Sequence, residues 1–212
     1  MQDEIGTKIA DRTVGHYLGA LSGGSPTPGG GSAAGMAGAL GCALGSMVCN
    51  LTLARKPLDS IADQQRIFLD LQQAMMALAE ADERVFGAYR EAAALPRATD
   101  EEKRVRREAI EKTLVDAAEV PVDLATQALE ALSLLQTTAI DSTPHAVGDL
   151  LTGGYLLQAT VLGSIENIEA NAGLMKSPEN RERFEVAASS IHADLASAMT
   201  GLQTAVATRR KG

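Results

Sequence analysis

The sequence predicts an all-α fold, a bundle of long antiparallel helices around a central uncharged, glycine-rich helix. Aromatic residues make up only 3% of the 212 residues and Trp is absent, whereas β-sheets are rich in aromatic and β-branched pairs. Residues 33–54 form a 22-residue run without a charge, as expected for a helix buried on all sides. No linker long enough to separate two domains occurs, so we expect residues 1–212 to form a single helical domain.

Prolines and capping residues set the boundaries of the predicted helices. Thr99 and Glu102 form a capping-box sequence at one helix start, and Ser177 followed by Pro178 is typical of an N-cap and a first helical residue. Pro121 is expected to kink or break the helix in which it lies. The six expected helices lie near residues 13–21, 31–54, 58–94, 100–134, 146–174 and 178–207.

The charge and the cysteines limit the classes of function. The net charge is −8, which argues against nucleic-acid binding because a nucleic-acid binder needs a basic face. The first ten residues lack the pattern of a secretion signal, so we expect a cytoplasmic protein. Cys42 and Cys49 are two helical turns apart, about 10 Å, which is too far for a disulfide between them. We expect both thiols to be reduced and buried.

The uncharged run also raises the question of a membrane span. Its length permits one. Its glycines recur at spacings of three and four, which allow close approach of neighbouring helices, and it contains the polar residues Ser46, Asn50 and Thr52. We therefore interpret it as the central helix of a soluble bundle and expect no membrane partner.

Asp82 breaks the apolar pattern of the helix predicted near residues 58–94. It occupies a heptad row with Ile61, Phe68, Met75 and Tyr89, which the pattern assigns to the core. A buried carboxylate is paired or has a raised pKa, and a raised pKa suits a general acid or base. The alternatives are a structural aspartate bonded to a neighbouring helix, or a register shift that exposes it. Asp149, which precedes a long uncharged stretch, raises the same question.

Two further polar features are candidate walls of a ligand site. Gly29, Gly30 and Gly31 precede a predicted helix, and the free amides of a helix start can bind a carboxylate, a phosphate or a carbonyl group. The alternative is that the glycines only let the loop pack tightly. The second feature is a polar stripe on the helix near residues 146–174, which is either a hydrogen-bonded seam between helices or one wall of a polar pocket. Its members are Thr160, Ser164, Asn167 and Asn171.

The sequence offers no pattern for metal chemistry. The three histidines, His16, His145 and His192, lack the spacing of metal ligands, so we expect no metal and no other cofactor. The charged segment 100–112 is expected to be a solvated helix face. A sharper hypothesis is that Arg104 and Arg107 attract an anionic part of a ligand.

Residues 25–56, SPTPGGGSAAGMAGALGCALGSMVCNLTLARK, closely resemble the signature of the cyclodeaminase/cyclohydrolase family. This family comprises the cyclodeaminase domain of formiminotransferase-cyclodeaminase and the stand-alone methenyltetrahydrofolate cyclohydrolases. The similarity continues at Asp82-x-x-x-Phe86, at residues 144–149 and at Asn167-x-x-x-Asn171. The resemblance implies an all-helical homodimer that acts on a tetrahydrofolate derivative.

The resemblance also implies roles for individual residues. Asp82 matches the aspartate assigned as catalytic in the family, and Lys56 matches a lysine of a lysine-rich motif, so both are predicted to be catalytic. Two departures stand out, because Leu58 replaces a tyrosine common in the family and Gly148 replaces a serine. The residues predicted to bind substrate are Pro28, Gly29, Gly30, Gly31, Ser32, Asn50, Asp149, Asn167 and Asn171.

Two related reactions fit this resemblance, and the first is our main prediction. A cyclohydrolase adds water to 5,10-methenyltetrahydrofolate and yields 10-formyltetrahydrofolate. A formiminotetrahydrofolate cyclodeaminase instead closes the ring and releases ammonia. A third hypothesis is a helical dimer without catalytic activity that binds folate or a protein partner.

Overall fold

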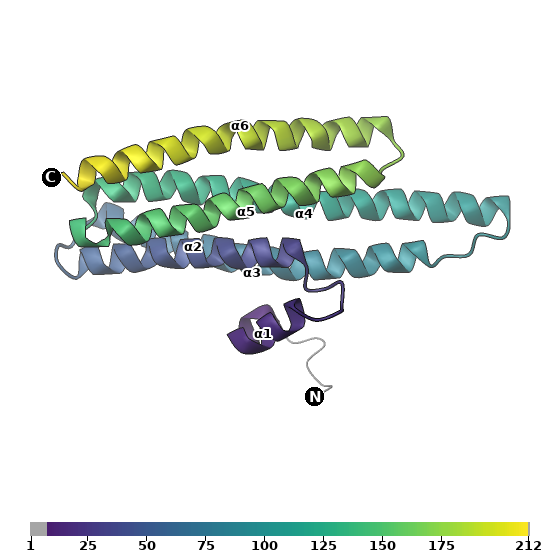
Figure 1. Cartoon of the computed structure of the whole chain (residues 1–212), viewed down its shortest axis with the longest axis horizontal. Helices are drawn as coiled ribbons and strands as arrows, with labels where there is room; N and C mark the ends of the chain where they lie inside the picture. The colour runs from purple at the N-terminus through teal and green to yellow at the C-terminus, as the bar shows by residue number, and fades with distance from the viewer. Residues whose placement is uncertain (1–7, 212) are drawn as a thin grey trace.

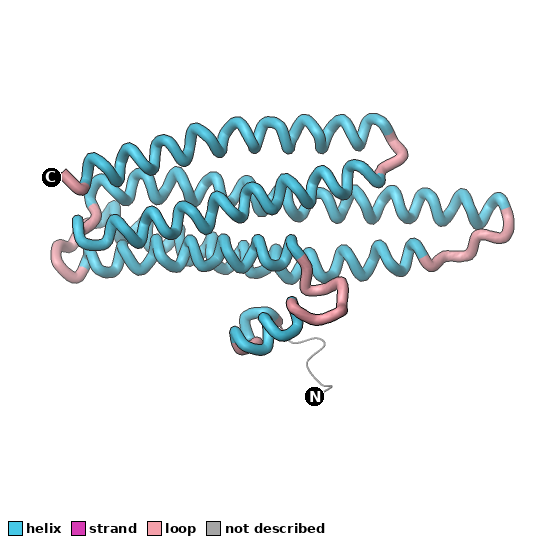
Figure 2. Tube along the Cα trace, in the orientation of Figure 1, coloured by secondary structure: helices cyan, strands magenta, loops and turns pink. Residues whose placement is uncertain are grey.

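The computed structural model describes residues 8–211, and within that range the chain forms helices and no strand. Figure 1 shows the long helices running side by side, with the short helix α1 standing below them. Successive long helices run antiparallel because short loops join them (Figure 2). The elements are η1 (Ile9–Asp11), α1 (Val14–Leu21), α2 (Gly30–Leu53), α3 (Asp59–Ala93), α4 (Asp100–Asp141), η2 (Pro144–Ala146), α5 (Val147–Leu174) and α6 (Pro178–Arg209).

The structure confirms the all-α bundle and most of the predicted boundaries. Thr99 and Glu102 form the expected capping box at the start of α4, and the Ser177 side chain accepts a hydrogen bond from the amide of Asn180 at the start of α6. These caps satisfy amides that a helix start leaves without an intrahelical partner. Local sequence therefore determines where α4 and α6 begin.

Pro121 does not break its helix, because α4 continues through it and ends at Asp141 instead of near residue 134. A proline inside a helix has no amide hydrogen for the carbonyl four residues earlier, which here belongs to Ala117. The side-chain amide of Asn171, on α5, donates to that carbonyl at 3.2 Å. A neighbouring helix thus replaces the hydrogen bond that Pro121 cannot make.

Glycines let α2 pack closely against two neighbouring helices. A Cβ atom on Gly35 would lie 2.8 Å from the Cβ of Ala79 on α3, and one on Gly41 would lie 2.9 Å from the carbonyl oxygen of Gly153 on α5. Both distances are shorter than real Cβ contacts. The glycine spacing that the sequence shows is therefore a packing device between backbones.

The helix α2 also meets the length and hydropathy criteria for a membrane span, and half of its most apolar window is buried inside the bundle. Its buried residues include Cys42 and Cys49, and both are free thiols as predicted. Burial raises the pKa of Cys42 to about 12 and that of Cys49 to about 11. Much of the surface of α2 thus lies in the interior of the bundle.

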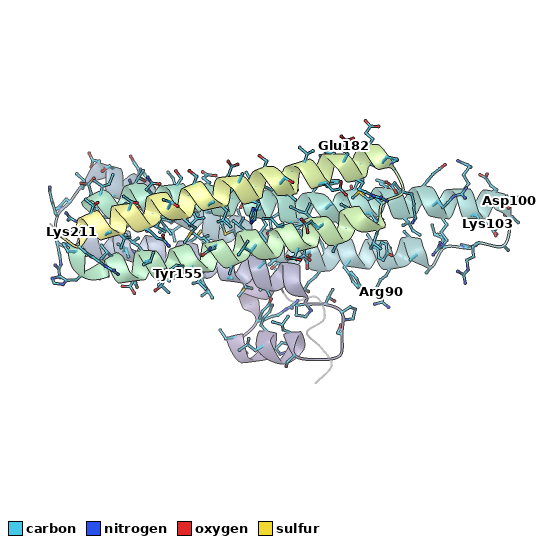
Figure 3. The ribbon with its side chains drawn as sticks, turned by 45° about the horizontal axis from the view of Figure 1, so that its top comes forward. Arg90, Asp100, Lys103, Tyr155, Glu182 and Lys211 are labelled. Atoms are coloured by element: carbon cyan, nitrogen blue, oxygen red, sulfur yellow. The ribbon has the colours of Figure 1, made fainter. Side chains whose placement is uncertain are left out.

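The hairpin of α3 and α4 extends beyond the other helices at one end of the bundle (Figure 2). Figure 3 places Asp100 and Lys103 at its tip. Lys103 pairs with Asp100, and Arg104 pairs with Glu101 and Glu108, all in exposed positions. The charged segment is therefore a solvated face, as expected.

Candidate functional site

Asp82 lies where α3 passes the N-terminal end of α2. Its Oδ2 atom accepts a hydrogen bond of 3.0 Å from the amide of Ser32, in the first turn of α2. The N-cap residue of α2 is Gly29, which has no side chain to satisfy the free amides. The carboxylate of Asp82 therefore caps a helix other than its own, which is the structural role that the sequence left open.

The approach of Asp82 to α2 requires glycine at position 31. A Cβ atom added to Gly31 would lie 2.6 Å from Cγ of Asp82, well inside van der Waals distance. The glycine loop is thus shaped around the carboxylate. Asp82, which the heptad pattern assigns to the core, is partly buried and lies against this loop.

Burial and two neighbouring groups set the acidity of Asp82. Burial raises the pKa of this carboxyl group, the amide hydrogen bond from Ser32 lowers it, and the neighbouring Glu83 raises it further. The net result is a pKa above the ordinary value for aspartate. A carboxyl group with a raised pKa exchanges protons more readily near neutral pH than an ordinary aspartate does.

The carboxylate opens onto a cavity of about 260 Å³ at the junction of α2, α3, α4 and α5. The glycine loop forms one wall, and apolar side chains of α3 and α4 form two others. A small, largely apolar cleft with a few convergent polar groups is the usual form of a ligand site. Its lining residues are Pro26, Thr27, Gly29, Gly30, Gly31, Asp82, Val85, Phe86, Tyr89, Leu114, Ala117, Asn167, Asn171 and Leu174.

The two asparagines of α5 contribute side-chain amides to this cavity. The side-chain nitrogen of Asn167 donates to the carbonyl of Gly163 at 2.7 Å, and that of Asn171 donates to Ala117. Because each amide nitrogen carries two hydrogens, one N–H and the amide oxygen of each asparagine remain for a ligand. Together with the carboxylate of Asp82, these groups let the cavity bind a ligand that carries N–H groups and positive charge.

The polar stripe of α5 combines the two roles that the sequence left open. Thr160 donates to the carbonyl of Ala34 on α2 at 2.9 Å, so this part of the stripe is a seam between helices. Ser164 is fully buried next to it. The asparagines at the other end line the cavity.

Three predicted site residues lie away from this cavity. Lys56 is exposed in the loop after α2, Asn50 is exposed near the C-terminal end of α2, and Asp149 lies in the first turn of α5. The 24 residues of α2, about 36 Å at 1.5 Å per residue, separate the Lys56 loop from the glycine loop. Within one chain, Lys56 and Asp82 are at opposite ends of α2.

Pro28 and Ser32 belong to the site without lining the cavity. Both are buried, and Ser32 lies behind Asp82, where its hydroxyl group is 3.0 Å from that of Tyr17. Sequence reasoning missed the apolar walls. Val85 and Phe86 follow Asp82 by three and four residues, so helical periodicity alone places them on its face.

Among residues 8–211, no group of three or more His, Cys, Asp or Glu side chains is placed to hold a metal ion. The polar groups that line the cavity comprise one carboxyl group of raised pKa, helix-start amides and two side-chain amides. Such a set can transfer protons and stabilise a cation.

Comparison with known proteins identifies relatives of similar sequence. The chain is 34% identical over 167 residues to a formimidoyltransferase-cyclodeaminase of Gallus gallus, covering 77% of this chain and 31% of the relative. It is 31% identical over 166 residues to a methenyltetrahydrofolate cyclohydrolase of Methylorubrum extorquens, covering 76% of this chain and 80% of the relative. The chain thus spans about a third of the first relative and most of the second.

The fold also matches a solved structure. The formiminotetrahydrofolate cyclodeaminase of Thermotoga maritima superposes with a TM-score of 0.83 at 19% identity, over 94% of this chain and 98% of that one. The family profile named Formiminotransferase-cyclodeaminase matches residues 13–190, a range that contains the glycine loop, Asp82 and both asparagines. The chain therefore belongs to the formiminotransferase-cyclodeaminase family.

Proposed function

We propose that this protein is a folate one-carbon enzyme that hydrolyses 5,10-methenyltetrahydrofolate to 10-formyltetrahydrofolate. The observation that carries the proposal is the partly buried carboxylate of Asp82, which is held by the Ser32 amide and lines a cavity together with the side-chain amides of Asn167 and Asn171. The methenyl substrate carries a positive charge on the ring that reacts. A carboxylate beside that ring stabilises the cation. The cyclohydrolase relative, of which the matched region covers 80%, supports this choice of reaction.

The reaction needs two proton transfers that one carboxyl group can perform. Water attacks the carbon that bridges N5 and N10, and Asp82 accepts a proton from that water. Asp82 then returns the proton to N5 as the bond between N5 and the carbon breaks. The remaining hydroxyl proton leaves to solvent as the formyl carbonyl forms on N10. A pKa raised by burial suits a group that must both accept and donate.

The cavity fits the ring portion of such a substrate. The amide oxygens of Asn167 and Asn171 are acceptors for the N–H groups of a pterin ring, and Phe86 and Tyr89 offer apolar contact. Its volume of about 260 Å³ lies just below the roughly 300–1,000 Å³ of typical ligand sites. The glutamate tail would therefore extend outside, and Arg107, two turns before Leu114 on α4, is a candidate contact for it.

Absorbance of 5,10-methenyltetrahydrofolate tests the proposal directly. We expect the purified protein to accelerate its decay well above the buffer rate, and Asp82→Asn to reduce kcat by about 10²–10⁴-fold. Asp70→Asn, an exposed aspartate on the same helix, is the matched control and should leave the rate unchanged. Wild-type protein no faster than buffer would overturn the proposal. Folate binding without turnover would favour a binding protein instead.

The cyclodeaminase reaction is the second candidate, favoured by the relative in Gallus gallus. There, N10 attacks the formimino carbon and the amino group leaves as ammonia, so a carboxyl group again protonates a leaving nitrogen. Formiminotetrahydrofolate supplied to the same protein distinguishes the two. Ammonia release faster than methenyltetrahydrofolate hydrolysis would exchange the ranking of the two reactions.

We further propose that two copies associate through an apolar face formed by α2 and α5. Leu40 and Leu51 on α2 are 56% and 45% exposed, and Tyr155 on α5 is 50% exposed. Figure 3 shows Tyr155 projecting from the bundle on the side where α1 lies. An apolar face of this kind is typical of an interface. A dimer with antiparallel α2 helices is also the arrangement in which the partner subunit's Lys56 can approach Asp82.

Light scattering of the purified protein tests the dimer. We expect the mass of two chains for the wild type and of one chain for Leu40→Glu. Val186→Glu, at an exposed position on α6, is the control and should remain dimeric. A wild-type mass of one chain would refute this part of the proposal.

A cytoplasmic location, without nucleic-acid or membrane partners, completes the proposal. The free thiols of Cys42 and Cys49 favour a reducing compartment, and the net charge of −8 disfavours binding to polyanions. Fractionation of cells that express the protein tests this. Recovery with the membrane fraction would contradict it.

A further inference from the structure

The segment that precedes the bundle, residues 8–21, packs next to the residues that hold Asp82. Helix α1 stands outside the bundle (Figure 1), and its Val14 and Leu18 are exposed. Its Tyr17 nevertheless is only 6% exposed and packs with Ile9 and Ala79 in a cluster separate from the main core. One aromatic side chain thus anchors this short helix beside α3.

The hydroxyl group of Tyr17 ends next to the residue that holds Asp82. It lies 3.0 Å from Oγ of Ser32, and Ser32 is fully buried. The amide of the same serine donates to Oδ2 of Asp82. A chain of two hydrogen bonds therefore runs from α1 through the first turn of α2 to the carboxylate.

The same segment is fastened to α3 on both sides of Asp82. The amide of Ile9 donates to Oε1 of Glu80 at 2.8 Å, and Arg12 forms an ion pair with Glu83 at 3.3 Å. Glu80, Asp82 and Glu83 belong to one turn of α3, and of these Asp82 points to α2. These contacts fix the position of Tyr17 relative to Asp82.

We propose that Tyr17 is a positioning residue, which holds Ser32 so that its amide stays directed at the Asp82 carboxylate. The proposal rests on the proposed function for its catalytic consequence, but the positioning itself can be measured without turnover. Tyr17→Phe keeps the packing of the ring and removes the hydroxyl group. Ser32 then loses the partner of its buried Oγ atom, and the first turn of α2 is held less firmly.

The charges around Asp82 determine the direction of the expected change. Glu83 on α3 raises the pKa of Asp82. Tyr17 on α1 interacts electrostatically with Asp82, and Arg12 forms an ion pair with Glu83. Tyr89 lines the same cavity. The residues that α2, α4 and α5 contribute to the cavity wall are not titratable. The Ser32 amide lowers the pKa of Asp82. A less firmly held amide therefore raises that pKa further.

Carboxyl ¹³C NMR titration of the full chain tests the positioning, with the Asp82 signal assigned from its loss in Asp82→Asn. We expect Tyr17→Phe to move the Asp82 pKa upward by about half a unit, as loosening of one hydrogen bond would do. Ser22→Ala removes an exposed hydroxyl group at the end of α1 and should leave the Asp82 pKa unchanged. An unchanged Asp82 pKa in a folded Tyr17→Phe protein overturns the inference.

A double-mutant cycle separates positioning from general loosening of the fold. Ser32→Ala removes the other end of the hydroxyl pair while keeping its amide, so we expect a similar pKa shift. Because both changes break one link, Tyr17→Phe combined with Ser32→Ala should shift the pKa no further than either alone. Additive shifts would overturn the link through Ser32.

Kinetics then show whether the positioning matters to catalysis. We expect kcat of Tyr17→Phe to fall roughly three- to tenfold with KM nearly unchanged. The acid limb of the pH–rate profile of this variant should move to higher pH. Wild-type protein without turnover would refute the proposed function and leave the NMR result standing. An active Tyr17→Phe with a wild-type pH profile would refute the inference alone.

Discussion

The two ends of α2 each make a polar contact with another part of the chain, and they differ in what that contact can do. At the C-terminal end, the Thr52 hydroxyl accepts a hydrogen bond from the amide of Thr143 and donates to the carbonyl of Val48. At the N-terminal end, the Ser32 amide donates to the carboxylate of Asp82. The first contact joins uncharged, buried groups. The second joins a helix start to an ionisable group at a cavity.

The comparison shows that burial alone does not make a site. Thr52 and Thr143 are both buried and their contact gives up no proton, so it only fastens the start of α5 to α2. Asp82 is only partly buried, and its bond to α2 coexists with access to a cavity. Chemistry at the N-terminal end thus follows from an incomplete burial that the glycine loop permits.

Gly31→Ala should have the largest effect, because it disturbs the contact at the N-terminal end of α2. The added methyl group would overlap the Asp82 carboxylate, which lies at the flexible end of its side chain. We expect that side chain to rotate away, with a loss of about 100-fold or more in kcat. Tm should change little, because the lost cap on α2 is offset by the higher helix propensity of Ala than of Gly. Activity assay and thermal unfolding of the same sample provide the measurement.

Gly148→Ala, in the first turn of α5, is the matched control. Nothing lies within 4 Å of a Cβ atom at Gly148, so we expect wild-type activity and stability. Equal losses in the two variants would mean that Gly31 is not special to the site.

Lys56→Ala tests whether the C-terminal end of α2 contributes across a dimer. If the partner subunit's Lys56 acts at Asp82, the variant should lose roughly tenfold in rate, as removal of one charged contact does. Arg55→Ala, the exposed neighbour, should have little effect. Lys56 stays a prediction until this is measured.

Dimers mixed from two variants provide a second test of the role of Lys56. Lys56→Ala and Asp82→Asn chains, unfolded together and refolded, should regain roughly a quarter of wild-type activity, because half the dimers are mixed and each carries one intact site. No regain over the separate variants would place Lys56 outside the reaction.

The sequence predicted the helices well because their boundaries are local. A capping box at Thr99 and a Ser177–Pro178 start depend on neighbouring residues only. The expected break at Pro121 does not occur, and the hydrogen bond that this proline cannot make is replaced by one from Asn171, on another helix. Such compensation has no local signal.

The site was predictable in part for the same reason. Asp82 was found because heptad periodicity measures position on one helix. Lys56 and Asp149 were predicted as site residues from motifs shared with the family, and a motif carries no information about distance. In the structure, the length of α2 separates both residues from the cavity. Tyr17 was missed because its contact with Ser32 joins two helices whose relative placement no periodicity gives.

Asn171→Ala should have a smaller effect, on stability. It leaves the Ala117 carbonyl without the donor that replaces the Pro121 amide, and we expect a loss of about 1 kcal/mol in the free energy of unfolding. In a Pro121→Ala background, the new backbone amide can donate to that carbonyl, so the same change should cost less. Denaturant unfolding of the four proteins measures this coupling, and equal costs in both backgrounds would contradict it.

Asn167→Ala is the control for that cycle. Its amide donates to Gly163, on its own helix, where the backbone amide of residue 167 already serves the same carbonyl. We expect a loss smaller than that of Asn171→Ala. A larger loss would indicate that the asparagine stripe acts through packing.

The smallest expected effect is on the pH dependence of stability in Asp82→Asn. Because burial raises the folded-state pKa of Asp82, folding favours its protonated form, and stability falls as pH rises from the unfolded to the folded pKa. Asparagine removes this loss and can still accept from the Ser32 amide. We expect Tm of the variant at pH 7 to equal or exceed that of the wild type by about one or two degrees. This gain should shrink as the pH falls toward the ordinary pKa of aspartate, whereas a less stable variant at pH 7 would mean that the cap on α2 requires the full charge of Asp82.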